Sequence, residues 1–277
     1  MRYMNIKAYK MDGLGNDFVI IDARSEEIEL SNDQITKICD REYIGCDQLI
    51  ILKKNQNTDA SLIFYNSDGS ISGACGNGTR CIAEFLNKEN KKETIVLTTS
   101  SGELISKILG DQLVSTEIGI PKLKWNEIPL SKDMNSKNLQ IKISDKNGND
   151  FIGGTAVNVG NPHVIFFVED ISKFEIKKIG PIIENSELFP EKCNVTIAQK
   201  INKDHIKVNV WERGAGLTKA CGTAACATAY AGKINQLTGN NTDIEFASGK
   251  LSILIDDKES IHMKGPVSDI KEINIKI

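Results

Sequence analysis

The chain has 277 residues and a formal net charge of -3, with 40 % hydrophobic and 26 % charged residues. This length is sufficient for about two domains with a substantial core. Lys and Arg alternate with Asp and Glu along the chain, so neither nucleic acid nor an anionic membrane is expected as a partner. Residues 1–13 lack the apolar core of a signal peptide, and the apolar run 164–168 is too short to span a bilayer. The seven cysteines do not resemble a disulfide framework, which favours a cytoplasmic protein with reduced thiols.

The hydrophobic periodicity predicts a mixed α/β protein. Short apolar or β-branched runs that end in polar turn residues predict strands at Val19–Asp22, Gln48–Leu52 and Ser61–Tyr65. Helical spacing or helix propensity predicts helices at Ser31–Arg41, Thr79–Leu86 and Thr223–Ala231, the first with Ser31 as its N-cap. Tight turns are expected at Asp68-Gly69 and Asn147-Gly148, and the segment 131–150 is expected to be a solvated loop or hairpin.

Short motifs of the first half return in the second half at an offset of 145 to 147 residues, in the same order. The repeated pairs are Gly15–Ile20 with Gly160–Ile165, Cys46-Asp47 with Cys193-Asn194, Ala74–Gly76 with Ala220–Gly222, and Ser101-Gly102 with Ser248-Gly249. Gly119-Ile120-Pro121 closes the first half, and Gly265-Pro266 closes the second. The pattern predicts two copies of one domain, with the division near residue 120.

Cys75 and Cys221 occupy the same position in the two halves, after a predicted strand and a glycine-rich turn and before a predicted helix. The exposed N–H groups at a helix N-terminus lower the pKa of a thiol and can also bind a carboxylate. Gly76, Gly78 and Gly222 allow a ligand to approach the backbone closely.

Two such thiols on opposite sides of one carbon could invert it: one thiolate removes a proton and the other thiol delivers one. This chemistry requires no metal and no pyridoxal cofactor. The alternative role of cysteine as a small buried hydrophobe is assigned to Cys39, Cys46, Cys81, Cys193 and Cys226. A zinc site is disfavoured because the cysteine spacing is wrong and the three histidines are dispersed.

Five motifs across the whole chain resemble those of the diaminopimelate epimerase family. They are Lys10–Phe18, Asn66–Ser70 with Cys75–Cys81, Gly160–His163, Glu212–Gly216, and Ala220–Thr223. The resemblance implies interconversion of LL- and meso-diaminopimelate, in lysine and peptidoglycan precursor biosynthesis, without a cofactor. It also implies a homodimer of two-domain chains, each domain a mainly antiparallel sheet wrapped on a central helix. The C-terminal strand returns to the first domain in this fold, so the expected domains are 1–120 with 267–277, and 121–266.

The resemblance also implies roles for individual residues. Cys75 and Cys221 are the acid/base pair, and His163 and Glu212 tune the chemistry. The reacting α-carboxylate is held by Gly76, Asn77, Gly222 and Thr223. The substrate site is lined by Asn16, Gln48, Asn66, Asn161, Asn194, Glu212 and Arg213.

The residue types themselves support these roles to different degrees. Arg213 is a natural bidentate partner for a second carboxylate, and asparagine amides suit an ammonium group beside a carboxylate. However, Asn16, Asn66 and Asn161 adjoin turn residues and are also consistent with Asx turns, and His163 is consistent with a packing role. Leu217 stands where the family usually has Glu, which puts the packing of that loop in question.

Four other functions compete with this interpretation. A proline or hydroxyproline racemase would use the same two thiols on a substrate with one carboxylate, but Arg213 and the amides favour a substrate that is charged at both ends. A cysteine-free isomerase of this fold is disfavoured by the presence of both thiols. A thiol redox protein is disfavoured because no Cys-x-x-Cys occurs. A binding module without catalysis would leave the duplicated thiols without a purpose.

Overall fold

The computed structural model describes residues 5–73 and 75–277, so Ala74 of the first repeated motif lies outside the described residues. The chain divides into two compact units. Unit 1 contains the residues up to Glu117 together with Gly265–Ile277, and unit 2 contains Ile118–Lys264. Within the described residues, no helix is long and apolar enough to cross a membrane.

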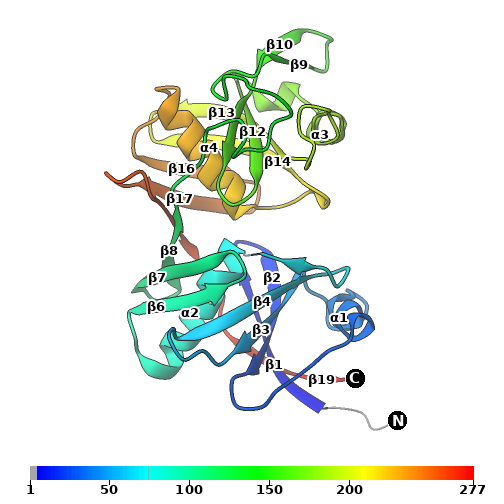
Figure 1. Cartoon of the computed structure of the whole chain (residues 1–277), viewed down its shortest axis with the longest axis vertical. Coiled ribbons are helices and arrows are strands. Elements are labelled where there is room, and N and C mark those ends of the chain that lie inside the picture. Colours follow the sequence, from blue (N-terminus) through cyan, green and yellow to red (C-terminus); the bar gives the residue numbers. More distant parts are fainter. Residues whose placement is uncertain (1–4, 74) are drawn as a thin grey trace. The chain divides into compact units, whose positions relative to one another are not determined.

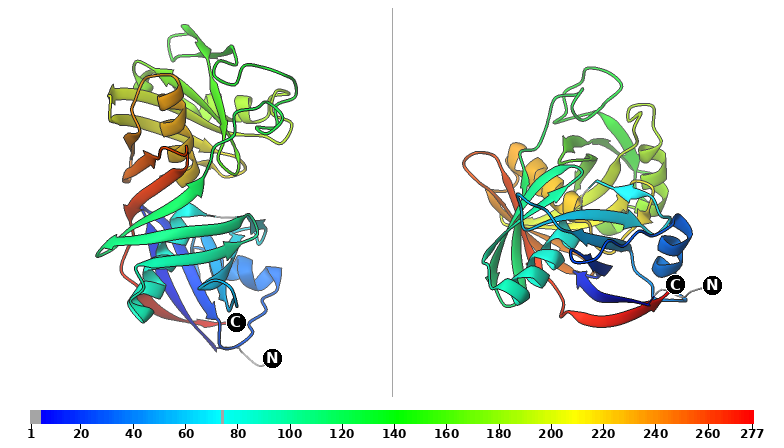
Figure 2. Two further views of the ribbon diagram at one scale, coloured as in Figure 1. Left: turned by 60° about the vertical axis from the view of Figure 1, so that its left-hand side comes forward. Right: turned by 60° about the horizontal axis from the view of Figure 1, so that its bottom comes forward.

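Unit 1 contains a mainly antiparallel sheet (Figure 1). Its strands are β1 (Asn5–Gly13), β2 (Asn16–Ala23), β3 (Gln48–Lys53), β4 (Ala60–Asn66), β5 (Ile71–Ser72), β6 (Thr94–Thr99), β7 (Gly102–Gly110), β8 (Leu113–Gly119) and β19 (Lys271–Lys276). The pairs β2–β3 and β4–β6 are parallel. The C-terminal strand β19 lies antiparallel beside β1, as both views of Figure 2 show.

Two helices pack on opposite faces of this sheet. Helix α1 (Asn32–Cys39) begins with a capping box, in which Ser31 accepts from the Gln34 backbone and Gln34 accepts from the Ser31 backbone. Helix α2 (Gly76–Asn90) ends at Lys91, whose left-handed conformation closes the last turn on Asn87. Alternation along the strands sends one set of side chains towards each helix.

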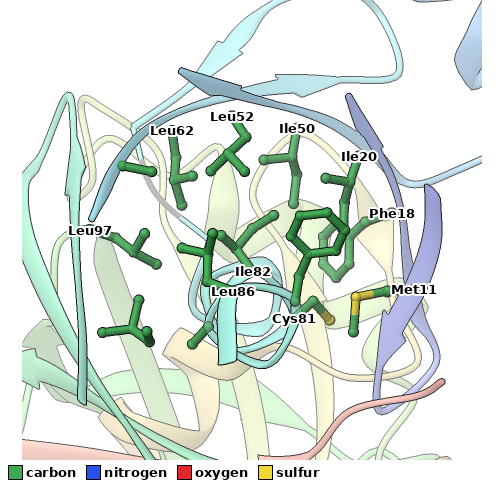
Figure 3. Close-up of a cluster of buried hydrophobic side chains, with 14 of the residues drawn as sticks. Met11, Phe18, Ile20, Ile50, Leu52, Leu62, Cys81, Ile82, Leu86 and Leu97 are labelled. Carbon is green, nitrogen blue, oxygen red and sulfur yellow. The ribbon is translucent and has the colours of Figure 1, made fainter. Parts of the chain in front are cut away.

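Helix α2 is the centre of the main core of unit 1. Figure 3 shows the curved strands around this helix, with Ile82 and Leu86 facing Phe18, Ile50 and Leu52. A smaller core on the other face packs Ile35 and Ile38 of α1 against strand residues such as Val19 and Leu49. Because α2 is surrounded by the sheet, the position of its first turn is fixed by packing.

From β11 onwards, unit 2 repeats the order of elements and the strand pairing of β1–β8, whereas the hairpin at residues 141–153, the 3-10 turn and the C-terminal strand β19 occur only once in the described chain. Its larger sheet consists of β11 (Thr155–Asn158), β12 (Pro162–Val168), β13 (Asn194–Asn202), β14 (His205–Glu212), β15 (Gly216–Leu217), β16 (Asn241–Phe246), β17 (Gly249–Ile255) and β18 (Ile261–Pro266). The pairs β12–β13 and β14–β16 are parallel, at the positions of β2–β3 and β4–β6 in unit 1.

The helices of unit 2 also correspond to those of unit 1. Helix α3 (Ile176–Glu184) follows a short 3-10 turn, η1 (Ile171–Lys173), and stands where α1 stands in unit 1. Helix α4 (Gly222–Ile234) corresponds to α2 (Figure 1). It contacts the neighbouring strands β11, β12 and β13 and the hairpin of β16 and β17. Its alanine-rich sequence leaves it buried over most of its circumference.

The elements that the sequence predicted agree with the structure, whereas helix α3 and most of the other strands were not predicted individually. The predicted strands lie within β2, β3 and β4, and the predicted helices correspond to α1, α2 and α4. The segment 131–150 is a loop that leads into the hairpin of β9 (Ile141–Ser144) and β10 (Asp150–Gly153). Helix α3 was not predicted, because Gly180 and Pro181 interrupt its apolar spacing.

Candidate active site

Cys75 is the N-cap of α2 and stands directly after the β4–β5 hairpin. Its backbone is extended, with φ of -141° and ψ of 111°, and its side chain is half-buried. The first helical hydrogen bond runs from the Thr79 N–H to the Cys75 carbonyl at 2.8 Å. The N–H groups of Gly76, Asn77 and Gly78 therefore precede the intrahelical ladder and are placed to bind an anion beside the thiol.

Cys221 has the equivalent position at the start of α4. It is the N-cap, with φ of -134° and ψ of 115°, and the Ala225 N–H bonds its carbonyl at 3.0 Å. Unlike Cys75, this side chain is buried, and burial raises the pKa of its thiol well above the ordinary value. The Glu212 carboxylate raises this pKa further, whereas the Thr223 hydroxyl, 3.4 Å from the sulfur, lowers it.

Asn16 and Asn77 meet beside the Cys75 thiol. The Cys75 sulfur is 3.7 Å from Asn16 Oδ1, which also accepts from Asn77 Nδ2 at 3.3 Å. Asn16 Nδ2 in turn donates to Asp47 at 3.0 Å. Neither Asn16 nor Asn77 uses its side chain for an Asx turn in these contacts.

Gln48 and Asn66 form a second pair of amides in unit 1, directly opposite each other on β3 and β4. Gln48 Nε2 donates to Asn66 Oδ1 at 2.8 Å, and Asn66 Nδ2 donates to Ser70 Oγ at 3.0 Å. Ser70 Oγ donates to Asp68. The buried Gln48 Oε1 has no hydrogen-bond partner among the described residues, so it is an acceptor for a donor group that the protein does not supply.

His163, Asn161 and Asn194 form a polar cluster in unit 2. His163 Nε2 is 2.8 Å from Asn161 Oδ1, which selects the tautomer with the proton on Nε2. The ring is completely buried, and burial together with the Arg213 charge lowers the pKa of His163 to about 3. The imidazole is therefore neutral at physiological pH. Its Nδ1 is also a buried acceptor without a partner in the described chain.

Arg213 stands in a tight turn between β14 and β15. The Ala215 N–H bonds the Glu212 carbonyl at 3.1 Å, and Gly214 has the positive φ (76°) that the third position of a type II turn requires. Asn194 Oδ1 accepts from the Arg213 backbone N–H at 3.0 Å, and the Arg213 guanidinium donates to the Glu191 carbonyl at 2.9 Å. Leu217 follows this turn and is 48 % exposed, so the departure from the family pattern changes no buried packing.

A buried carboxylate, Glu184 of α3, supports the same turn. One oxygen accepts from the Trp211 indole at 2.7 Å and the other from the Gly214 N–H at 2.9 Å. Nothing in the sequence analysis indicated Glu184, because α3 itself was missed. The sequence analysis also gave no role to the buried Arg80, which donates to Asn77 Oδ1 at 3.0 Å, or to Asp47, which accepts from Asn16. Asp47 nevertheless occupies the position of Asn194 in the repeated motif.

Within each unit, the structure brings together most of the expected site residues. Cys75 lies with Asn16 and Asn77, and Gln48 with Asn66. Cys221 lies with Glu212 and Thr223, and His163 with the two remaining asparagines. Gly76 and Gly222 contribute only backbone, as the first residues of α2 and α4. The five other cysteines are buried thiols, as expected from their apolar neighbours.

Comparisons with known proteins identify the family. The family model for diaminopimelate epimerase matches residues 8–124 and 155–270. The chain belongs to the diaminopimelate epimerase family. A diaminopimelate epimerase of Pelagibacter ubique is 67 % identical over 99 % of this chain and 100 % of its own length. One from Zymomonas mobilis is 40 % identical over 96 % of this chain and 95 % of its own.

Solved structures confirm the mixed α/β fold. A phenazine biosynthesis protein of the PhzF family from Bacillus anthracis matches with a TM-score of 0.69 at 16 % identity, over 99 % of this chain and 100 % of its own. A hydroxyproline epimerase from Agrobacterium vitis matches with the same TM-score at 10 % identity, over 100 % of this chain and 92 % of its own. At such identities these similarities concern the fold alone.

Proposed function

We propose that this protein interconverts LL- and meso-diaminopimelate with Cys75 and Cys221 as its two proton carriers. The observation that supports this function best is the equivalent placement of both thiols, each as the N-cap of a buried helix, in a member of this family. Helix N-termini favour both a thiolate and a bound carboxylate. The protein is thus an isomerase acting on an amino acid, and the scheme uses no cofactor.

The two thiols take opposite parts in one reaction. A thiolate removes the Cα proton, and the electron pair of the broken C–H bond is delocalised into the adjacent carboxylate. The other thiol then gives its proton to the opposite face of Cα and becomes the thiolate. Burial and Glu212 raise the pKa of Cys221, which favours Cys221 as the proton donor and Cys75 as the base when a substrate binds to the resting enzyme.

The polar residues around the thiols match the groups of diaminopimelate. The N–H groups at the start of α2 and α4 suit the α-carboxylate, which takes up negative charge during the reaction. The Arg213 guanidinium suits the distal carboxylate, since its planar fork can make two parallel hydrogen bonds. The bare Gln48 Oε1 suits an ammonium group.

The setting of the reaction follows from the substrate. Diaminopimelate epimerisation serves lysine and peptidoglycan precursor biosynthesis, and we place it in the cytoplasm. We also propose that the protein is a homodimer, which size-exclusion chromatography with light scattering would test.

Exchange with heavy water tests the activity directly. The protein is incubated in D2O with LL-diaminopimelate or with L-proline, and the loss of the Cα proton signal is followed by NMR. We expect deuterium at Cα of diaminopimelate and none in proline. Deuterium in proline alone would favour a proline-type racemase instead. Absence of exchange in both substrates, with the protein folded and its thiols reduced, would contradict the proposal.

A further inference from the structure

A chain of hydrogen bonds crosses unit 1 from one arginine to another and passes the Cys75 thiol. Arg80 Nη2 donates to Asn77 Oδ1 at 3.0 Å, and Asn77 Nδ2 donates to Asn16 Oδ1 at 3.3 Å. Asn16 Nδ2 donates to Asp47 Oδ2 at 3.0 Å, and the other Asp47 oxygen accepts from Arg41. Every link from Arg80 to Asp47 therefore runs in the same direction.

The two ends of the chain determine how both amides are turned. A guanidinium can only donate, so Asn77 must present its oxygen to Arg80 and its NH2 group to Asn16. An ionised carboxylate can only accept, so Asn16 must present its NH2 group to Asp47. Both requirements leave Asn16 Oδ1 facing Asn77 and the Cys75 thiol, 3.7 Å from the sulfur.

We propose that Asp47 is a positioning residue: it holds the Asn16 amide so that the carbonyl oxygen, and not the NH2 group, faces the Cys75 sulfur. The proposal deepens the proposed function and rests on it for its role in catalysis. A carbonyl oxygen accepts a hydrogen bond from the thiol and repels the thiolate. It therefore favours the form of Cys75 that has taken a proton from the substrate and makes this thiolate a stronger base.

Asp47 is suited to this role because several donors converge on its carboxylate. Asn16 Nδ2 and the Asp17 backbone N–H share one oxygen, at 3.0 and 3.2 Å, and Arg41 takes the other. Arg41 also makes a bidentate contact with Asp17, which holds the arginine in place. In unit 2 the equivalent position is the neutral Asn194, and there the Asn161 oxygen is turned towards His163 instead.

The substitution Asp47→Asn would disturb this arrangement without changing the shape of the side chain. An amide offers one acceptor oxygen to these donors and brings two N–H donors of its own. With its oxygen on Arg41, the new NH2 group would face both Asn16 Nδ2 and the Asp17 N–H. We expect the Asn16 amide to turn over, because this restores the 3.0 Å contact with residue 47 at the expense of the longer, 3.3 Å hydrogen bond from Asn77. The Asn16 NH2 group would then donate to the Cys75 sulfur, stabilise the thiolate and lower the thiol pKa.

The charge removed from residue 47 also lowers the pKa of Cys75, so the experiment must separate the two effects. The charged and titratable groups that the described residues place beside this thiol or its network include Lys10, Asp12, Asp17, Arg41, Cys46, Asp47, Arg80 and Cys81. In an Asn16→Leu background, Asp47→Asn still removes the same charge, because leucine has nearly the same size and no titratable group, but residue 16 has no amide that can turn over. The difference between the two backgrounds therefore isolates the orientation of the amide.

The readout is the pH dependence of Cys75 alkylation by iodoacetamide, followed by mass spectrometry of the Cys75 peptide in the full-length protein. We expect Asp47→Asn to lower the apparent pKa by about one unit more in the Asn16 background than in the Asn16→Leu background, a tenfold difference in thiolate fraction at low pH. Asp111→Asn, which removes an exposed carboxylate paired with Lys88, should leave the profile unchanged. Equal shifts in the two backgrounds would overturn the proposal.

A measurement on the unaltered protein covers the case in which the variants do not fold. In the 15N-labelled protein, the Asn16 side-chain NH2 protons should show NOEs to the Asp17 backbone amide, because both groups donate to the same Asp47 oxygen. NOEs to the Cys75 β-protons in place of these would refute the orientation. Neither experiment uses a substrate, so both results stand even if deuterium exchange fails with diaminopimelate.

Discussion

The substitution Glu184→Gln tests whether a buried carboxylate holds the Arg213 turn in place. Glu184 is 6 % exposed, and its two oxygens accept from the Trp211 indole and the Gly214 N–H. Glutamine has almost the same shape but only one acceptor oxygen. One of the two N–H groups would therefore face an NH2 group.

The expected loss follows from these two contacts. Each hydrogen bond to a charged group contributes about 1.5–3 kcal/mol, and a buried donor left without an acceptor costs about 1–3 kcal/mol. Glutamine keeps one neutral bond, so the net destabilisation of unit 2 is about 2–4 kcal/mol. For a domain of this size, such a loss lowers the melting temperature by about 5–15 °C.

Arg213 is carried by the same turn, so the substitution should also weaken substrate binding. We expect KM for diaminopimelate to rise several-fold and kcat to change less, because the thiols themselves are not altered. The control is Glu187→Gln, in the exposed segment that follows α3, which should change neither quantity. An unchanged melting temperature and KM in Glu184→Gln would refute this reasoning.

Three further outcomes are expected. Cys75→Ala and Cys221→Ala should each lower epimerase activity at least about 10²-fold, because each face of the carbon needs its own proton carrier. The circular dichroism spectrum of both variants should stay unchanged. A single variant with normal rates in both directions would exclude the two-thiol mechanism. Gly78→Ala should lower the free energy of unfolding of unit 1, measured in urea, by about 1–3 kcal/mol, because the new Cβ would lie 2.8 Å from Phe64 and 2.9 Å from Ile50. The control is Gly239→Ala, where nothing lies within 4 Å of the new Cβ, and this variant should change the free energy of unfolding by less than about 0.5 kcal/mol. The free energy of unfolding should fall as the pH drops from about 6.5 to about 3, because His163 takes a proton in the unfolded chain before it does in the folded one. This residue contributes at most about 5 kcal/mol to that decrease. In His163→Gln, the urea concentration at the unfolding midpoint should depend less on pH over the same range.

Three strands and three helices could be predicted from local patterns because local signals and packing agree there, whereas the wider fold was expected from the internal repeat and the family resemblance. Ser31 and Gln34 form the capping box that starts α1, and the apolar spacing of Ile35 and Ile38 matches the face that the helix buries. Helix α3 could not be predicted in this way. Its Pro181 removes a hydrogen-bond donor from the last turn, and the helix is maintained by burial of Ile176, Ile179 and Ile183 in the core of unit 2.

The two thiols and their glycines were visible in the sequence because the same short motif occurs twice. The residues that orient the polar groups were not visible, because their roles depend on contacts between distant segments. Asp47 reaches Asn16 across 31 positions, and Glu184 reaches Gly214 across 30. A single carboxylate among polar neighbours in the sequence gives no sign that distant N–H donors converge on it.

The two units present the same backbone to the thiols but different neighbours, and this difference has a chemical consequence. Asn66 ends β4 before the first helix, whereas Glu212 occupies the equivalent end of β14 before the second. An uncharged amide at this position adds no charge beside the thiol, whereas a carboxylate beside a buried thiol raises its pKa. If the surroundings had remained identical, both thiols would release their protons over the same pH range. A reaction that needs one thiolate and one thiol at the same time would then have few enzyme molecules in the productive state. Burial of Cys221 and the carboxylate at one of the two equivalent positions both raise the pKa of that thiol, and in the proposed mechanism this favours unequal protonation of the pair. The repeated helix start still supplies both halves with the same site for a carboxylate.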